Sequence, residues 1–132
     1  MATIRRFENI QAWQKARELV RRVYKVSAGG AFKQDYGLRE QIRRAAVSAM
    51  SNIAEGFGRK TSRDFAHFLD VAKGSAVEVE SLLYVALDIG YIHADEFQEL
   101  YRMAEEVIAL VGGFTSYLRR AGGRTEQLRT PN

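Results

Sequence analysis

The sequence predicts an all-α protein, organised as an antiparallel up-down-up-down four-helix bundle. Four segments carry apolar residues at spacings of three and four, the repeat that places side chains on one face of a helix. The only proline is Pro131, so no residue in the body of the chain interrupts a helix. No segment alternates apolar and polar residues over the length of a strand. Four such helices joined by short loops stack antiparallel.

The first predicted helix runs from about Asn9 to Ser27. Its apolar positions are Ile10, Trp13, Ala16, Val20 and Val23. Its other face is basic and presents Lys15, Arg17, Arg21, Arg22 and Lys25. The paired glycines of the segment AGGA (28–31) end this helix, because two glycines inside a helix cost about 2 kcal/mol relative to alanines.

The second predicted helix begins between Asp35 and Leu38 and ends between Gly56 and Gly58. From Ala45 to Ala54 no residue is charged and nearly every residue is small. An ordinary amphipathic helix needs only one apolar stripe, so this helix lacks the expected polar face. Two interpretations stay open: the helix is buried within its own bundle, or it is shared with a neighbouring subunit.

The third predicted helix follows a capping box, with the Thr61 hydroxyl at the cap and Asp64 three residues later. It continues to about Ile89, and Gly90 ends it. Its apolar positions are Phe65, Phe68, Leu69, Ala72, Ala76, Val79, Leu83 and Ala86.

The fourth predicted helix runs from near Ala94 to Arg120, with His93 as the cap and Glu96 as the returning partner. The pair Gly112-Gly113 should weaken this helix, which indicates close packing or a local break. The sequence thus divides into a four-helix bundle over residues 1–120 and a disordered C-terminal tail over residues 121–132, which has no periodicity.

Charge is strongly segregated along the chain. Residues 1–63 carry 14 Lys/Arg against 5 Asp/Glu, a net charge of +9, whereas residues 64–118 carry 2 against 10, a net charge of −8. The basic half can bind a polyanion, or it can bind the acidic half of another copy in a head-to-tail contact. The chain lacks cysteine, a secretion signal and an apolar run long enough to span a bilayer, so we expect a cytoplasmic protein with no membrane partner.

Catalysis has little support in the sequence, and no catalytic residue, cofactor or metal site is predicted. His67 and His93 are the only histidines, and neither has a second ligand at a metal-binding spacing. The glycines of the segment EGFGRK (55–60) follow a helix and do not form a phosphate-binding loop.

A narrow polar stripe marks the second predicted helix. Arg44, Ser48 and Glu55 lie on it, with Asn52 beside it, and Glu78 lies on a comparable line of the third helix. If the two lines face each other, Arg44 can pair with Glu78 or Glu55. We interpret these five residues as a structural network that fixes helix register and subunit contacts, with a catalytic carboxylate as the weaker alternative.

The basic face of the first helix is the candidate for function. Together with basic residues of and after the second helix, the nucleic-acid-binding candidates are Lys15, Arg17, Arg21, Arg22, Lys25, Arg39, Arg43, Arg59, Lys60 and Arg63. Such side chains on a rigid surface bind phosphates without reading sequence. Four interleaved aromatic residues can stack on bases if they are exposed: Trp13, Tyr24, Phe32 and Tyr36. The alternative is a solvated charged surface above a core that contains Trp13.

Three segments carry a family resemblance: QIRRAAVSAMSNIAEGFGR (41–59), DFAHFLDVAKGSAVEVESLL (64–83) and LDIGYI (87–92). With them the chain resembles the four-helix bundle protein family, also called the 23S rRNA intervening-sequence protein family, from Phe7 to about Leu118. The motif residues here are Arg43, Arg44, Asn52, Glu55, Arg59, Gly74, Ser75 and Glu78, and packing or assembly accounts for most of them.

The resemblance implies a bundle that assembles as a homopentameric barrel and brings no catalytic residues. The family is similar to Avd, the accessory protein of diversity-generating retroelements, a basic pentamer that binds nucleic acid and partners a reverse transcriptase. Members are encoded within insertions in bacterial 23S rRNA genes, which suggests a link to RNA. The acidity of residues 64–118 argues against a uniformly basic barrel here, so only selected surfaces should attract RNA.

The sequence therefore predicts a non-enzymatic oligomeric scaffold that binds nucleic acid, RNA rather than DNA, through its first helical hairpin. Its expected partners are copies of itself, RNA or DNA, and a reverse transcriptase or other protein. The alternative is a protein-interaction module whose charge segregation serves only self-assembly and partner docking.

Overall fold

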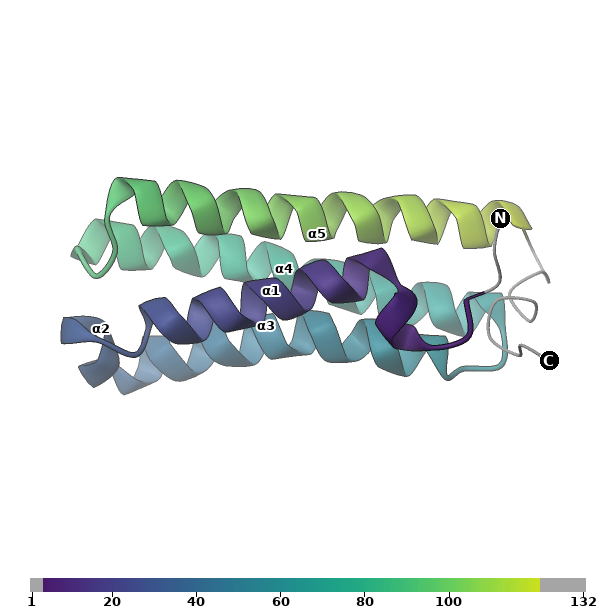
Figure 1. Cartoon of the computed structure of the whole chain (residues 1–132), viewed down its shortest axis with the longest axis horizontal. Coiled ribbons are helices and arrows are strands. Elements are labelled where there is room, and N and C mark those ends of the chain that lie inside the picture. Colours follow the sequence, from purple (N-terminus) through teal and green to yellow (C-terminus); the bar gives the residue numbers. More distant parts are fainter. Residues whose placement is uncertain (1–3, 122–132) are drawn as a thin grey trace.

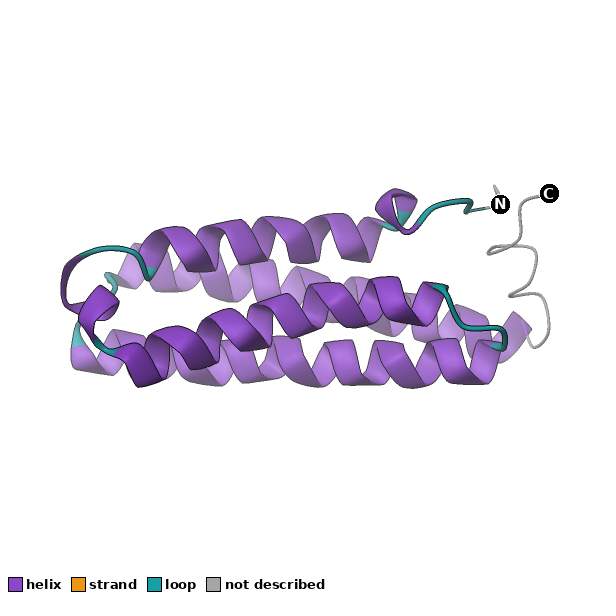
Figure 2. Ribbon diagram, turned by 90° about the horizontal axis from the view of Figure 1, so that it is seen from below, coloured by secondary structure: helices purple, strands orange, loops and turns teal. Residues whose placement is uncertain are grey.

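The computed structural model of the chain describes residues 4–121. They form a short 3-10 helix η1 (Phe7–Asn9) and five α-helices: α1 (Gln11–Val26), α2 (Gly30–Gln34), α3 (Tyr36–Phe57), α4 (Ser62–Ile89) and α5 (Ala94–Ala121). These residues contain no strand, so the all-α prediction is confirmed (Figure 2). The predicted tail lies outside the described residues, apart from Ala121 at the end of α5.

The four long helices α1, α3, α4 and α5 lie side by side, and short connections join them at the ends (Figure 1). α3 packs against α4, α4 packs against α5, and α1 packs against both α3 and α5. α1 and α4 therefore lie diagonally across the bundle. The five-residue helix α2, which the sequence did not predict, lies between α1 and α3 at one end (Figure 1).

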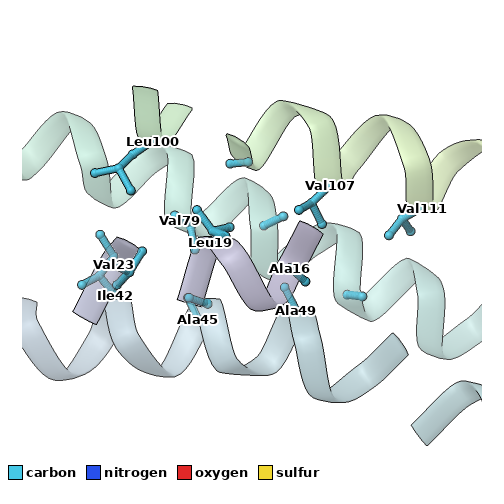
Figure 3. Close-up of a cluster of buried hydrophobic side chains, with 14 of the residues drawn as sticks. Ala16, Leu19, Val23, Ile42, Ala45, Ala49, Val79, Leu100, Val107 and Val111 are labelled. Carbon is cyan, nitrogen blue, oxygen red and sulfur yellow. The ribbon is translucent and has the colours of Figure 1, made fainter. Parts of the chain in front are cut away.

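The core runs along the axis between the long helices. Figure 3 shows buried side chains from all four converging there: Ala16, Leu19, Val23, Ile42, Ala45, Ala49, Val79, Leu100, Val107 and Val111. In α1 the sequence analysis placed Val20 in the core and overlooked Leu19. Leu19 is completely buried and Val20 only half-buried, because the inward spacing is Ala12, Ala16, Leu19 and Val23.

The helix boundaries follow the capping residues. The Thr61 hydroxyl accepts a hydrogen bond from the backbone N–H of Asp64 at 3.1 Å, and the His93 N–H donates to Glu96 Oε1 at 2.9 Å. Gly90 ends α4 with φ +91°, a left-handed conformation that favours glycine. The cap by the Thr61 hydroxyl, the return of Glu96 to His93 and the end of α4 at Gly90 are therefore confirmed. Asp35 also caps α3 by accepting from the N–H of Leu38.

Neither the expected local break nor close packing within the chain is found at Gly112 and Gly113. α5 continues through them without a break, and a Cβ added at either position would meet nothing within 4 Å. The close approach lies instead at Gly56 of α3, which is buried. A Cβ there would stand 2.8 Å from Cβ of Phe68, so only glycine lets α3 lie this close to α4.

The uncharged stretch of α3 is largely covered by its own chain. Ala45, Ala46, Ala49 and Ile53 are buried, and only Val47 and Ser51 of residues 45–54 are exposed. Burial within the bundle therefore accounts for most of the missing polar face. A contribution of α3 to a subunit contact stays a prediction, and it rests on those two exposed residues.

Candidate nucleic-acid interface

The structure distributes the ten predicted binding residues over three places. Five lie along α1, Arg39 and Arg43 lie in the first turns of α3 beside α2, and Arg59, Lys60 and Arg63 surround the α3–α4 connection at the other end (Figure 1). The rise from Arg43 to Arg59 is about 24 Å at 1.5 Å per residue. The ten residues therefore do not form a single patch.

Two of the α1 residues are engaged by α5. Arg22 donates to Glu99 with Nη2 and Oε1 2.6 Å apart, and this hydrogen bond lowers the pKa of the Glu99 carboxyl below its ordinary value. Lys15 Nζ lies 3.5 Å from Glu18 and 3.8 Å from Glu106. These groups line a cleft between α1 and α5 in which acidic and basic side chains alternate. Three carboxylates offset most of the charge of its four basic side chains, so it is a poor site for a polyanion.

Arg17 and Lys25 point to solvent, and Arg21 is exposed although it also lines that cleft. Arg17, Arg21 and Lys25 are exposed and form no ion pair within residues 4–121. Arg17 and Arg21 are four residues apart and Tyr24 follows three residues later, so the three share one face of the helix. This face continues onto α3 through Tyr24.

Tyr24 of α1 meets Arg43 of α3. The Arg43 guanidinium lies 4.4 Å from the centre of the Tyr24 ring, and its Nε donates to the Ser27 hydroxyl at 2.8 Å. Ser27 is buried and its hydroxyl donates in turn to the Val23 carbonyl. Arg43 is therefore held in place by a neutral partner, and it forms no ion pair with a carboxylate within residues 4–121.

Tyr36 and Arg39 repeat this arrangement one turn earlier on α3. The Arg39 guanidinium lies 4.5 Å from the centre of the Tyr36 ring and donates to the Lys33 carbonyl at 2.9 Å. Glu40 accepts from Arg39 Nε at 3.2 Å. We refer to Tyr24, Arg43, Arg39 and Tyr36 as the Tyr–Arg row. Of the four aromatic residues proposed for stacking, Tyr24 and Tyr36 are exposed, whereas Trp13 and Phe32 are buried and cannot stack on a base.

The predicted polar network is only partly assembled within the chain. Ser48 and Ser75 share a hydrogen bond of 2.8 Å between α3 and α4, and Asn52 donates to Ser48. Glu78 accepts from Gln41 rather than from Arg44. Arg44 and Glu55 are exposed, and within the described part of the chain no ion pair joins Arg44 to Glu55 or Glu78.

The outward side of α4 is a surface that the sequence analysis missed. Val71, Val77, Val85 and Ile89 are 40–55% exposed there, and the small residues Gly74 and Ser81 lie between them. We call these six residues the α4 face. Their spacings of three and four, outside the inward stripe of the same helix, were the available signal.

A second missed feature is Glu80, which is buried between α4 and α5. Burial and the neighbouring Glu105 carboxyl raise its pKa to about 7, and its charge together with that of Glu105 raises the pKa of Tyr101. A shifted carboxyl is typical of catalytic sites. Here its neighbours are acids and phenols, and residues 4–121 hold no group of three potential metal ligands.

The four long helices also fail to meet the requirements of a membrane span. None of the helices within residues 4–121 combines sufficient length with sufficient apolar content to cross a bilayer.

Comparison with known proteins supports the same fold. Residues 8–113 match the model of a family described as 23S rRNA-intervening sequence protein. A crystal structure from Bacteroides thetaiotaomicron, described as a protein with unknown function from the S23 ribosomal protein family, superposes with a TM-score of 0.72 at 22% identity. The match covers 79% of this chain and 97% of that one. No curated protein matches the chain.

Proposed function

The chain belongs to the 23S rRNA-intervening sequence protein family, and from this premise we propose that it is a non-enzymatic oligomeric scaffold for nucleic acid. It binds RNA in preference to DNA through the basic surface of its first helical hairpin, α1 with the start of α3. The family link to an rRNA insertion supports RNA as the ligand.

The observation that carries the proposal is how the basic groups are partnered. Lys15 and Arg22 are paired with carboxylates of α5, whereas Arg17, Arg21 and Arg43 have no carboxylate partner within residues 4–121. Unpaired guanidinium groups on a rigid helix surface attract phosphates through charge and release condensed counterions on binding. The proposed surface therefore consists of Arg17, Arg21, Lys25 and Arg43, and the rest of the Tyr–Arg row, with the Arg39–Glu40 pair, adjoins it.

The proposed unit of assembly is an antiparallel up-down-up-down four-helix bundle, and the proposed assembly is a homopentameric ring. The α4 face supports a contact between copies, because apolar side chains flanked by Gly74 and Ser81 permit close approach of another helix. A ring places different faces of neighbouring copies in contact, so the α4 face of one copy can meet a surface of the next copy other than α1 and leave the basic surface open to RNA.

Charge reversal tests the binding function. The triple variant R17E/R21E/K25E should lower the affinity for a fluorescent single-stranded oligoribonucleotide by about tenfold or more at 50 mM salt, and should flatten the salt dependence. Arg22 is left unchanged because its reversal would place a new carboxylate beside Glu99. The matched control, R5E/K73E/R120E, changes the net charge equally at exposed residues outside the proposed surface and should retain more affinity. Equal losses in the two variants would contradict the proposed surface.

A protein-interaction module remains the second candidate, and the exposed valines of the α4 face favour it. Under this function the oligomer forms, but RNA does not bind at physiological salt. Light scattering separates the two candidates when it is combined with the binding assay. A pentamer has five times the 14.9 kDa of one chain.

A further inference from the structure

The Tyr–Arg row offers aromatic rings with one open face. Tyr36 is 67% exposed and Tyr24 is 43% exposed, although a guanidinium lies over each ring. Since the guanidinium covers one face and so much of the Tyr36 ring stays accessible, the other face of that ring is open to solvent. A flat group can stack there without displacing any side chain.

The guanidinium groups of the row are fixed before any ligand arrives. The Lys33 carbonyl holds Arg39, and the Ser27 hydroxyl holds Arg43, both through hydrogen bonds shorter than 3 Å. Fixed side chains lose little conformational entropy on binding. A base can stack on the ring or on the guanidinium plane, and Arg43, whose partner is a neutral hydroxyl, keeps its positive charge available to a phosphate.

The surroundings of the row suit a short single strand. Tyr36 and Arg43 are separated by about 10 Å along α3, enough for two or three nucleotides. Lys25 and Lys33 are exposed beside the two tyrosines. The nearby carboxylates are engaged: Glu40 pairs with Arg39, and Asp35 caps α3 and accepts from the Tyr91 hydroxyl at 2.9 Å.

We propose that the Tyr–Arg row binds unpaired bases of single-stranded RNA by stacking on Tyr24 and Tyr36. This inference rests on the proposed function and specifies its ligand. In a duplex each base face is covered by its neighbours, so a tyrosine on a convex helix surface cannot reach one. The bases of a single-stranded segment are accessible, and stacking on aromatic rings tolerates any base.

The test compares one RNA sequence in two forms. A fluorescent twelve-nucleotide RNA is measured by anisotropy, first alone and then annealed to its complement, against the wild-type chain and Y24A/Y36A. We expect the double variant to lose roughly tenfold in single-strand affinity per ring and to bind the duplex as the wild type does. Y24F/Y36F keeps both rings and should bind the single strand normally. Y84A, which removes an exposed tyrosine from α4, should also bind normally.

The outcomes separate the two proposals. If Y24A/Y36A binds the single strand as tightly as the wild type, or loses affinity equally for both forms, the stacking inference is wrong while charge-dependent binding stands. If the wild type binds neither form at 50 mM salt, the proposed function itself fails. A loss in Y24F/Y36F equal to that of Y24A/Y36A would assign the effect to the hydroxyls and would also overturn stacking.

Discussion

α1 and α4 lie diagonally across the bundle, and each exposes one side to solvent in a different way. The inward side of α1 is apolar and is buried within the chain, and its outward side is charged and faces solvent. α4 buries its inward side equally well, yet its outward side carries the four exposed apolar residues of the α4 face. The contrast teaches that α1 buries its apolar side within a single chain, whereas α4 leaves apolar area exposed, which is the area that the proposed contact between copies would bury.

Two exposed tyrosines, Tyr36 on α3 and Tyr84 on α4, show how the environments of the two surfaces differ. Tyr36 lies under the guanidinium of Arg39, with the ring centre 4.5 Å away. Tyr84 of α4 lies against Phe97 and Tyr101 of α5, with ring centres 4.8 Å and 5.8 Å apart. The first environment is cationic and suits phosphates and bases, while the second is aromatic and bordered by acids. An exposed tyrosine therefore lies on a basic surface in one case and on an aromatic surface near carboxyl groups in the other.

The largest expected effect is the loss of assembly when α4 is charged. V77E/V85E places two carboxylates on the α4 face, and burying them against a neighbouring copy costs several kcal/mol each. We expect light scattering over a concentration series to show a monomer for this variant and a pentamer for the wild type. Both positions are exposed in the single chain, so the helical circular dichroism should not change.

V47E supplies the matched control on α3, since Val47 is 37% exposed. An oligomer that survives V77E/V85E but dissociates in V47E would place the contact on α3, in agreement with one of the two interpretations that the sequence left open. A monomeric wild type would show that no other copy covers the α4 face, and this would contradict the proposed assembly.

The comparison also shows what the sequence could predict. The four long helices and the caps at Thr61, Gly90 and His93 follow from local spacing and chemistry, which act over one or two turns. The pairing of Arg22 with Glu99 does not, because it depends on how α5 is placed against α1. In the same way, the sequence analysis assigned Arg43 and Arg59 to one binding surface. The structure places them near opposite ends of α3, so they belong to different surfaces.

The two missed features have a common cause. Val77 and Glu80 both lie on α4, three residues apart, and one is exposed while the other is buried. A helix with apolar residues on most sides gives no clear boundary between its inward and outward positions. Spacing alone therefore could not assign an apolar residue to the surface or a carboxyl to the interior.

The next effect concerns the contact of α3 with the inward side of α4 at Gly56, where there is no room for an added atom. G56A adds a Cβ 2.8 Å from Cβ of Phe68 and 2.9 Å from Cδ1 of Phe65. Separating α3 from α4 should lower the free energy of unfolding by about 2–3 kcal/mol, measured by urea denaturation. G58A is the control, since its nearest contact is an ordinary 3.5 Å and its φ is −80°. Equal stability of the two variants would show that the helices have room to move apart.

A smaller effect is expected at the acidic contact between α4 and α5. Glu80 has a pKa of about 7 in the fold against an ordinary value of 4.5, owing to burial and to Glu105. Between these pH values the folded chain keeps a proton that the unfolded chain releases. This contribution to stability is therefore complete below pH 4.5 and is lost as the pH rises through 7.

E80Q should abolish that loss, because its amide does not titrate. Urea unfolding at pH 5 and pH 8 should show a decline on the order of 2 kcal/mol in the wild type and a much smaller one in E80Q. The other titratable groups at this contact, Glu105, Tyr84 and Tyr101, are unchanged in the variant. E55Q, at an exposed carboxyl of α3, should decline as the wild type does. An E80Q decline as steep as that of the wild type would assign the pH dependence to another group.

The smallest expected effect is that of an added methyl group at an exposed glycine, and it tests whether another copy packs closely against α4. Gly74 on α4 and Gly113 on α5 are both exposed, and a Cβ at either position meets nothing within 4 Å in the single chain. Alanine favours a helix over glycine by about 0.8–1 kcal/mol, so each substitution alone should stabilise a monomer by that amount.

G113A should show this gain in urea denaturation without altering assembly. G74A should instead raise the concentration needed for the oligomer, because its methyl group meets the neighbouring copy. If G74A and G113A gain stability equally and assemble equally, nothing packs closely against Gly74, and the α4 face is an ordinary solvated surface.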